Sequence, residues 1–354
     1  MLIRKQNLCR STQTITFSDK GEEIMPTIPQ TRFTEFLSDI EPSNTTKNDA
    51  SSAHTTLRDF LKNEEDFKEY HRNTFLSGSY KRDTAVRPRK REDETERPDI
   101  DIIVETTHTR EDTPEEVVNL VYNTLEKKYS EIRLQDRSVG IETSKADMDV
   151  VPVIKHDGIY FIPDRKQGIW LPTNPPGHTT WTTETNKTAG KRFKPLVKLM
   201  KWWRREKPTL DKKPKGFAME CFTAYCMDYV ETYYGELFVQ TLEAIVEKYE
   251  WYTLFRRVPS LPDPGIQSNS VTDGMTVDAF IDFYNTAKEY AELGRKALNQ
   301  TDPEEATKLW KDIFGDRFPK TEGTNSNSLL APAATTETSF PDKPAGPKRP
   351  TGFA

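Results

Sequence analysis

The chain has 354 residues, with 51 Lys and Arg against 56 Asp and Glu, so its formal net charge is −5. This balance argues against a protein that coats nucleic acid non-specifically, because such binding needs a surplus of Lys and Arg. Its apolar runs are far shorter than the ~18 residues of a membrane helix, and its N-terminus lacks the apolar region of a secretory signal. Its three cysteines, Cys9, Cys221 and Cys226, form neither a disulfide framework nor a zinc pattern. Together these features favour a cytoplasmic protein with no membrane partner.

The N-terminal part begins with a stretch that gives no structural signal. Residues 1–24 are polar and aperiodic, and we expect a disordered leader there. Residues 31–40 then carry apolar side chains at the i, i+3, i+4, i+7 spacing of an amphipathic helix. A second helix is expected at residues 50–67, after the helix-stopping segment that begins at Glu41.

A mixed pattern of strands and helices follows. The predicted strands are short, apolar and partly alternating, and a charged loop over residues 82–98 separates the first strand from the second. This order predicts a mixed α/β first domain over residues 25–185, the N-terminal helices included. Strands are expected at 74–76, 99–104 and 146–154, and a helix at 114–128.

The second half of the chain has a helical period. Joints rich in Pro and Gly separate the periodic stretches, and we expect a helical domain over residues 186–320. Residues 321–354 are rich in Pro, Ser, Thr and Ala and predict a disordered tail. The whole chain is therefore predicted to be α+β. Helices are expected at 192–206, 216–235, 237–249, 276–299 and 304–314.

Acidic residues on the predicted strands are the central feature. Asp99 and Asp101 are two positions apart, so both side chains lie on one face of a strand, with α-carbons ~6.6–7 Å apart. Asp147 and Asp149 repeat this pattern on a later strand. Asp-x-Asp alone is more often a solvated strand end, but clustered carboxylates repel each other unless a cation neutralises them. Hard oxygen ligands predict two Mg²⁺ ions, with Mn²⁺ as a substitute, rather than zinc.

Gly78 and Ser79 follow the first predicted strand. Glycine lets a backbone approach an anion closely, and exposed N–H groups and the Ser79 hydroxyl can hold a phosphate. A Gly-Ser dipeptide alone is usually an ordinary turn. A strand, Gly-Ser and a helix followed by a strand with Asp-x-Asp is much rarer, and this combination resembles the active-site pattern of the nucleotidyltransferase superfamily that includes polymerase β.

The helix predicted over 192–206 has two distinct faces. Its apolar side chains fall on one side at ~100° per residue. Lys194, Lys198, Lys201 and Arg205 gather on the roughly opposite side, and no Asp or Glu between Lys191 and Arg205 can form an i, i+4 pair with them. This stripe of one sign indicates an anionic partner such as a triphosphate, although a merely basic surface helix has the same pattern.

The chain resembles the bacterial cGAS/DncV-like nucleotidyltransferases (CD-NTases), the cyclic oligonucleotide synthases of CBASS anti-phage operons. The resemblance extends from about Met25 to Pro319. It is carried by Phe75-Leu76-Ser77-Gly78-Ser79-Tyr80 with Arg82 and Thr84, Asp99-x-Asp101, Asp149-Val150-Val151-Pro152, Thr173-Asn174-Pro175, Leu199-Met200-Lys201-Trp202-Trp203, Phe217-x-Met219-Glu220, Asp263-Pro264 and Leu309-Trp310-Lys311.

The resemblance implies a fold and an acidic site. The fold would be a polymerase β-like mixed sheet with helices and a C-terminal helical domain, in two lobes with the active site between them. Asp99, Asp101 and Asp149 would be the catalytic residues and the ligands of two Mg²⁺ ions. Asp149 is preferred to Asp147, because the family pattern has the aspartate directly before the apolar pair and the proline.

The resemblance also implies nucleotide contacts. Gly78 and Ser79 would bind the donor triphosphate, and Lys201 would be a further triphosphate contact. Gly216 departs from the pattern, because relatives often have serine before the Phe-x-x-Glu element, and this puts one base or phosphate contact in doubt.

We therefore predict a synthase that makes a cyclic di- or trinucleotide from ATP and other NTPs. The alternatives are a nucleotidyltransferase that modifies RNA or protein and a non-catalytic nucleotide sensor; no sequence-specific nucleic-acid partner is expected. In operons of this family with E1- and E2-like proteins, a synthase C-terminus that ends in a small residue is conjugated to targets, and Ala354 would be the joined residue here.

Overall fold

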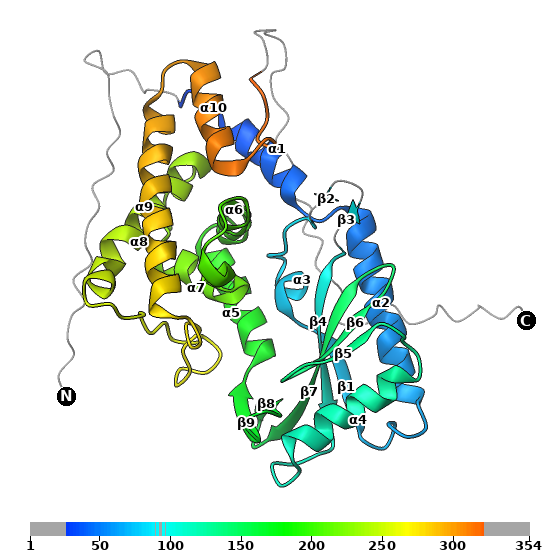
Figure 1. The fold of residues 1–354 in the computed structure, drawn as a ribbon. Helices are drawn as coiled ribbons and strands as arrows, with labels where there is room; N and C mark the ends of the chain where they lie inside the picture. Colours follow the sequence, from blue (N-terminus) through cyan, green and yellow to red (C-terminus); the bar gives the residue numbers. More distant parts are fainter. Residues whose placement is uncertain (1–25, 89, 92–93, 96, 322–354) are drawn as a thin grey trace, which may run out of the picture.

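Two lobes, a sheet lobe and a helical lobe, make up the chain (Figure 1). The computed structural model describes residues 26–88, 90–91, 94–95 and 97–321. The leader predicted over 1–24 and all but the first residue of the predicted tail, Ala354 included, lie outside this range, so those expectations stay predictions.

A seven-stranded mixed sheet forms the sheet lobe. The strand order is β1-β4-β7-β6-β5, and β8 pairs with both β7 and β9. Strands β4 and β7 are parallel, whereas the other neighbours are antiparallel. A separate antiparallel ribbon of two strands, β2 and β3, each two residues long, lies in the charged loop that precedes β4. The strands are β1 (His71–Leu76), β2 (Lys90–Arg91), β3 (Glu94–Thr95), β4 (Asp99–Thr106), β5 (Ile132–Leu134), β6 (Val139–Glu142), β7 (Asp147–His156), β8 (Ile159–Asp164) and β9 (Ile169–Thr173).

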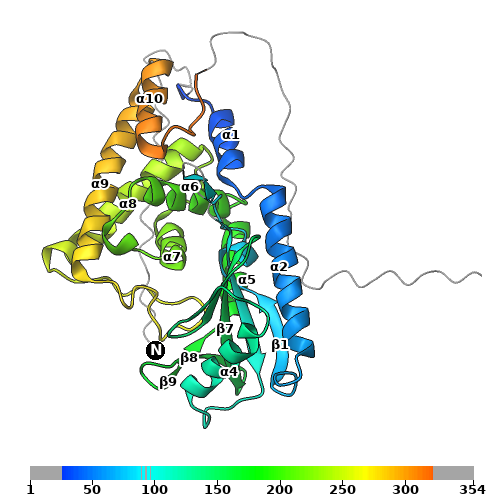
Figure 2. The same cartoon turned by 45° about the vertical axis from the view of Figure 1, so that its right-hand side comes forward.

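Two helices pack on one face of this sheet (Figures 1 and 2): α2 (Asn44–Asn63) and α4 (Pro114–Glu126). Helix α4 begins with a capping box between Thr113 and Glu116, and α2 has Ser43 as its N-cap. The alternate residues Ile100 and Ile102 of β4 are fully buried in the same core as both helices. Because side chains alternate along a strand, the residues between them point to the opposite face, toward the other lobe.

The helical lobe has its own core, and the first helix belongs to it. The fully buried Phe33 and Phe36 of α1 pack against Trp310 and Phe314 of the last helix. Helix α1, which the predicted domain over residues 25–185 includes, thus packs in the core of the helical lobe, because its apolar stripe fits this aromatic cluster. The helices are α1 (Gln30–Ile40), α5 (Pro175–Thr188), α6 (Phe193–Glu206), α7 (Gly216–Cys226), α8 (Tyr234–Leu254), α9 (Val277–Asn299) and α10 (Pro303–Phe314).

The predicted α+β class, a mixed sheet with helices followed by a helical part, is confirmed. One predicted helix is too long: the stretch expected over 216–235 ends at Cys226, since the Asp228 carboxylate accepts hydrogen bonds from the backbone N–H groups of Val230 and Glu231 and holds a turn. Strands β5, β6, β8 and β9 and helix α5 were not predicted.

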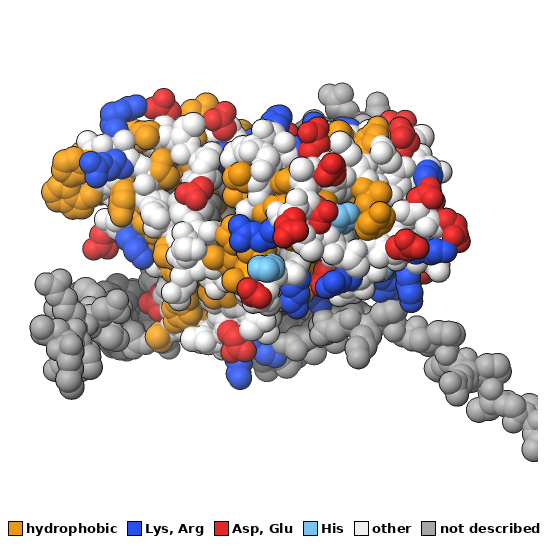
Figure 3. All heavy atoms as spheres, turned by 90° about the horizontal axis from the view of Figure 1, so that it is seen from below, with side chains coloured by type: hydrophobic (Ala, Val, Ile, Leu, Met, Phe, Trp, Pro, Cys, Tyr) orange, Lys and Arg blue, Asp and Glu red, His pale blue; other side chains and the backbone are white. Residues whose placement is uncertain are grey.

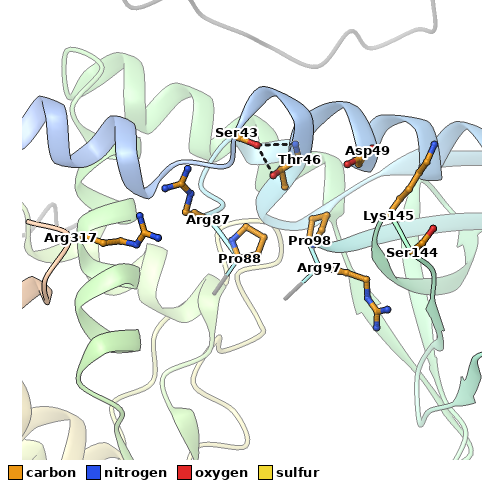
Figure 4. A pocket seen from close by; sticks show the side chains of 10 residues that line it. All are labelled: Ser43, Thr46, Asp49, Arg87, Pro88, Arg97, Pro98, Ser144, Lys145 and Arg317. Atoms are coloured by element: carbon orange, nitrogen blue, oxygen red, sulfur yellow. Dashed lines mark hydrogen bonds between the residues drawn. The ribbon is translucent and has the colours of Figure 1, made fainter. Parts of the chain in front are cut away.

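The described residues form a surface of mixed charge and a cavity that both lobes line. Viewed from below, acidic and basic side chains are interspersed over the face in Figure 3. No helix among the described residues is long and apolar enough to span a membrane. A cavity of about 460 Å³ is lined by residues of both lobes, and four of them are cations (Figure 4): Arg87, Arg97, Lys145 and Arg317.

Candidate active site

The aspartates predicted from the sequence meet on two neighbouring strands. In the parallel pairing of β4 with β7, Asp99 lies opposite Asp147 and Asp101 lies opposite Asp149. Neighbouring strands are ~4.8 Å apart, and positions two apart share a face. All four carboxylates therefore lie at the start of both strands, on the face opposite the core packed under α2 and α4.

The charges of these aspartates act on one another. The pKa of Asp99 is raised to about 7, chiefly by desolvation and then by the neighbouring carboxylates of Asp101 and Asp149. Burial also raises the pKa of Asp101, and the Arg82 guanidinium partly opposes this effect. Burial and the neighbouring carboxylates both disfavour the ionised form of these groups, and a bound cation would offset both effects.

The two aspartates of β7 have different partners. Asp147 is ion-paired through Oδ1 with Arg97 Nε at 2.7 Å, and this arginine also lines the cavity in Figure 4. Asp149 instead accepts a hydrogen bond from Gln135 Nε2 at 3.0 Å. Over the described ranges, no three His, Cys, Asp or Glu side chains are already gathered as a metal site. The donors present are nevertheless all carboxylate oxygens, which suit a hard divalent cation.

Gly78 and Ser79 lie directly beside these aspartates. They open the short helix α3 (Gly78–Arg82), which lies between β4 and α5 where the lobes meet (Figure 1). The backbone N–H of Ser77 donates to the Asp101 carbonyl at 2.8 Å, so the turn is fixed to β4. At Gly78 φ is +65°, and a Cβ atom there would lie 1.6 Å from Asp101 Oδ2. Only glycine fits this position, because both the backbone and the space forbid a side chain.

Lys201 lies inside the protein, on α6. Its ammonium donates to the backbone carbonyl and the hydroxyl of Thr84, both at 3.2 Å, and to Glu220 Oε1 at 2.7 Å. Only 7% of the Lys201 surface is exposed, and Glu220 is fully buried. An ammonium has three donors, and all three have protein acceptors here. The assignment of Lys201 to the triphosphate stays a prediction.

The other lysines of α6 also have partners. Lys198, 3% exposed, pairs with Glu41 at 2.7 Å and with Asp83 at 3.2 Å. Lys194 lies 3.8 Å from the same Asp83 carboxylate. The single-sign stripe predicts an anionic ligand because α6 itself has no acidic partner for these lysines. The structure shows that carboxylates from other elements supply these partners.

Several residues near the site were not assigned from the sequence. Arg82 and Glu220 belong to the motifs of the family resemblance but have no predicted role, and Gln135 and Arg97 have no signal in the sequence. Glu220 had one usable signal, since it is a carboxylate within the apolar run from Phe217 to Phe222. A charged residue in such a run is almost never buried without a partner.

The fold and the site define a class of protein. Paired aspartates on parallel strands beside a Gly-Ser turn, in a sheet lobe joined to a helical lobe, are typical of a polymerase β-like nucleotidyltransferase. Residues 27–186 match the family model described as Second Messenger Oligonucleotide or Dinucleotide Synthetase domain.

Curated relatives match almost from end to end. The chain is 47% identical over 343 residues to the cyclic AMP-AMP-AMP synthase of an Acinetobacter strain. The aligned residues cover 94% of this chain and 99% of the relative. It is 30% identical to the cyclic AMP-AMP-GMP synthase of Enterobacter hormaechei, over 92% of this chain and 99% of the relative. The chain therefore belongs to the CD-NTase family and is a cyclic oligonucleotide synthase, a nucleotidyltransferase, as predicted.

Solved structures share the fold at low identity. CdnC of E. coli MS115-1, solved with ATP, has a TM-score of 0.67 at 19% identity, with 83% of this chain and 99% of that chain covered. CdnG of Bradyrhizobium diazoefficiens, solved with GTP, has a TM-score of 0.68 at 14% identity, with 81% and 95% covered. The predicted two-lobed nucleotidyltransferase fold is thus confirmed.

Proposed function

We propose that this enzyme makes a cyclic trinucleotide of three adenosine monophosphates from ATP. The observation that carries the proposal is the 47% identity to the Acinetobacter cyclic AMP-AMP-AMP synthase along nearly the whole of both chains. The Enterobacter relative at 30% identity is also named for a trinucleotide, but one that contains GMP. Both relatives are thus named for trinucleotides, and their names differ at one base.

Asp99, Asp101 and Asp149 hold two Mg²⁺ ions in this proposal. Their shared strand face supports it, as do the burial and the neighbouring carboxylates that raise the pKa of Asp99 to about 7. When bound, such cations lower the pKa of an attacking ribose hydroxyl and stabilise charge on the departing pyrophosphate. Mn²⁺, another oxygen-preferring cation, should substitute.

The protein's own groups then orient the reactants. Gly78 has no side chain, so the Asp101 carboxylate can lie against the turn. The Ser79 hydroxyl and the N–H groups of the turn can donate to a triphosphate. Asp149 lies beside Asp101 on the next strand, where it can accept the proton of the attacking hydroxyl. The linear intermediate then turns in the site and is closed into a ring.

The biological setting follows from the family. We infer that the cyclic product is a second messenger in bacterial anti-phage defence. CdnC of E. coli has been solved in complex with HORMA-deltaN, which supports a regulatory protein partner for this enzyme as well. An E1- or E2-like partner and conjugation through Ala354 form a separate proposal. Mass spectrometry of cells that carry the full operon tests it, and the lack of any Ala354-linked adduct would reject it.

The test uses the purified full chain with Mg²⁺ and either ATP alone or all four NTPs. After phosphatase treatment, the products are identified by mass. We expect a phosphatase-resistant product with the mass of three AMP units from ATP alone, and none from the variant D99N/D101N. A product that forms only when GTP or another NTP is added would overturn the adenine assignment. In a parallel reaction with labelled NTPs and added RNA or protein, label in that RNA or protein instead of a cyclic product would favour the alternative transferase activities.

A further inference from the structure

A glutamine beside the proposed metal ligands contacts one of their carboxylates. Gln135 directly follows β5, and its Nε2 donates to Asp149 Oδ1 at 3.0 Å. Because an ionised carboxylate only accepts hydrogen bonds, the amide nitrogen rather than the amide oxygen has to face it. This hydrogen bond restrains the rotation of the carboxylate, so the direction of its second oxygen is restrained as well. A metal ligand that is already oriented does not have to be ordered when a cation binds.

The Gln135 side chain is itself held by the turn that joins β5 to β6. The Ser138 hydroxyl donates to Gln135 Oε1 at 2.7 Å, and the backbone N–H of Gln135 donates to the Ser138 carbonyl at 3.0 Å. Arg165, which directly follows β8, donates from Nε to the Gln135 carbonyl at 3.0 Å. Both ends of the amide and both backbone groups of Gln135 therefore have partners, and these contacts fix the amide toward Asp149.

A glycine on the neighbouring strand provides the space for this amide. Gly140 of β6 lies opposite Asp149 of β7 and opposite Arg133 of β5, so it is on the same sheet face as the aspartates. A Cβ atom at Gly140 would lie 2.6 Å from Gln135 Nε2, whereas the next nearest atoms, on Arg133, would be 3.5 Å away. The φ angle of Gly140 is not positive, so its backbone would accept alanine. The missing side chain at this position is therefore what lets the amide reach Asp149.

We propose that Gln135 is a positioning residue that orients the Asp149 carboxylate for a divalent cation, and that Gly140 provides the space that Gln135 needs. The inference rests on the proposed function, because Gln135 acts through Asp149 as a ligand of Mg²⁺. Removal of a hydrogen-bond partner of a metal ligand typically lowers metal affinity or activity by ~10- to 100-fold. Gln135 therefore acts on the affinity for the metal without contact with the nucleotide.

Two variants break the same hydrogen bond in different ways. Q135A removes the donor, whereas G140A keeps the donor but places a methyl group where the Gln135 amide lies. That amide is the end of a flexible side chain, so it gives way in G140A more easily than the strand does. The Kd of the full chain for Mn²⁺ is measured from the EPR signal of the free ion, and the rate of cyclic product formation is measured at limiting Mg²⁺. Each variant should raise the Kd about tenfold and lower the rate by a similar factor.

The double variant Q135A/G140A tests whether the glycine acts through the glutamine. Once the amide is removed, a methyl group at position 140 meets no listed neighbour closer than 3.5 Å, an ordinary contact distance. G140A should therefore change the Kd for Mn²⁺ by less than about twofold in the Q135A background, because both changes break one hydrogen bond. Effects of Q135A and G140A that multiply would show that the two residues act independently, and would overturn the inference.

Q240A is the matched control. Gln240 Nε2 also donates to a carboxylate, Glu236 Oε1, at 2.9 Å, but this pair lies on α8 in the helical lobe. Q240A should bind Mn²⁺ and form product as the wild type does. If Q135A and G140A also keep the wild-type Kd, the inference is overturned while the proposed function stands. A wild type that makes no cyclic product would refute the proposed function instead.

Discussion

Gly78 is the residue at which the active site leaves least room for change. Because a Cβ atom there would lie 1.6 Å from Asp101 Oδ2, we expect Gly78→Ala to displace either that carboxylate or the turn that carries Ser79. A shift of ~1 Å at a reacting group can cost ~10²-fold in rate. Formation of the cyclic product should therefore fall about 100-fold, as measured by chromatography of the reaction mixture.

Gly158→Ala is the matched control for this prediction. Gly158 also has a positive φ, +81°, but nothing lies within 4 Å of a Cβ atom built there. Both variants place an L residue in the left-handed region, at a cost of about 1–2 kcal/mol. Only Gly78→Ala adds a collision. Equal losses of activity in the two variants would show that backbone strain alone is responsible.

The choice between Asp149 and Asp147 is also decided at the residue scale. Among the described residues, Asp147 is already ion-paired with Arg97, whereas Asp149 accepts a hydrogen bond from a neutral amide donor, Gln135. We expect D149N to lower turnover by at least about 100-fold, since it removes a proposed metal ligand. D147N should lower turnover by less than about fivefold, because it removes only a partly exposed ion pair and such pairs contribute little. The reverse ranking in initial rates would exchange the two assignments.

Strands β4 and β7 bring the carboxylates together, and the repulsion between these carboxylates predicts that a bound metal ion stabilises the folded protein. A cation that binds the folded state alone stabilises it, and this stabilisation grows with the logarithm of the cation concentration once the site is mostly filled. Mg²⁺ should therefore raise the melting temperature of the wild type by several degrees, and chelation with EDTA should reverse the rise. The triple variant D99N/D101N/D149N should melt at the same temperature with and without Mg²⁺. An equal rise in that variant would place the metal elsewhere.

The elements with a strong period could be predicted from the sequence, and those that depend on distant partners could not. Helices α1, α6, α9 and α10 were expected close to their observed bounds, because each has a continuous apolar stripe. Helix α5 was missed because its threonines are weak helix formers; it is held by Trp181, which packs on Phe193 and Phe217. Asp157-Gly158 is the two-residue turn between β7 and β8, so this Asp-Gly pair is the local signal for strand β8.

The same limit applies to the site. Alternation on a strand was enough to place Asp99 and Asp101 on one face, but their parallel pairing with Asp147 and Asp149 is a property of the sheet. The acidic partners of Lys198 and Lys201 come from α7 and from positions that follow α1 and α3. Such contacts depend on how the chain folds back on itself, and no local spacing encodes them.

On the scale of the whole molecule, the lobes have separate cores and are joined beside the active site by buried charges. Glu220 is the central acceptor of this joint. Burial alone would raise its pKa, but the Lys201 ammonium and the Arg82 guanidinium outweigh burial and lower the pKa from 4.5 to about 2. A carboxylate with a lower pKa in the folded state stabilises that state above its unfolded pKa, and this stability is lost as the pH falls toward the folded pKa.

This linkage predicts a pH-dependent difference between the wild type and Glu220→Gln. At neutral pH the variant should be less stable by about 3–5 kcal/mol, since two buried cations lose their anion. The difference should shrink by about 2 kcal/mol between about pH 5 and pH 3, because only the wild type takes up a proton at this position on unfolding. Urea unfolding of both proteins across this range measures it. A difference that stays constant with pH would mean that Glu220 is not held as a carboxylate by Lys201 and Arg82, and that the two lobes are joined by packing instead.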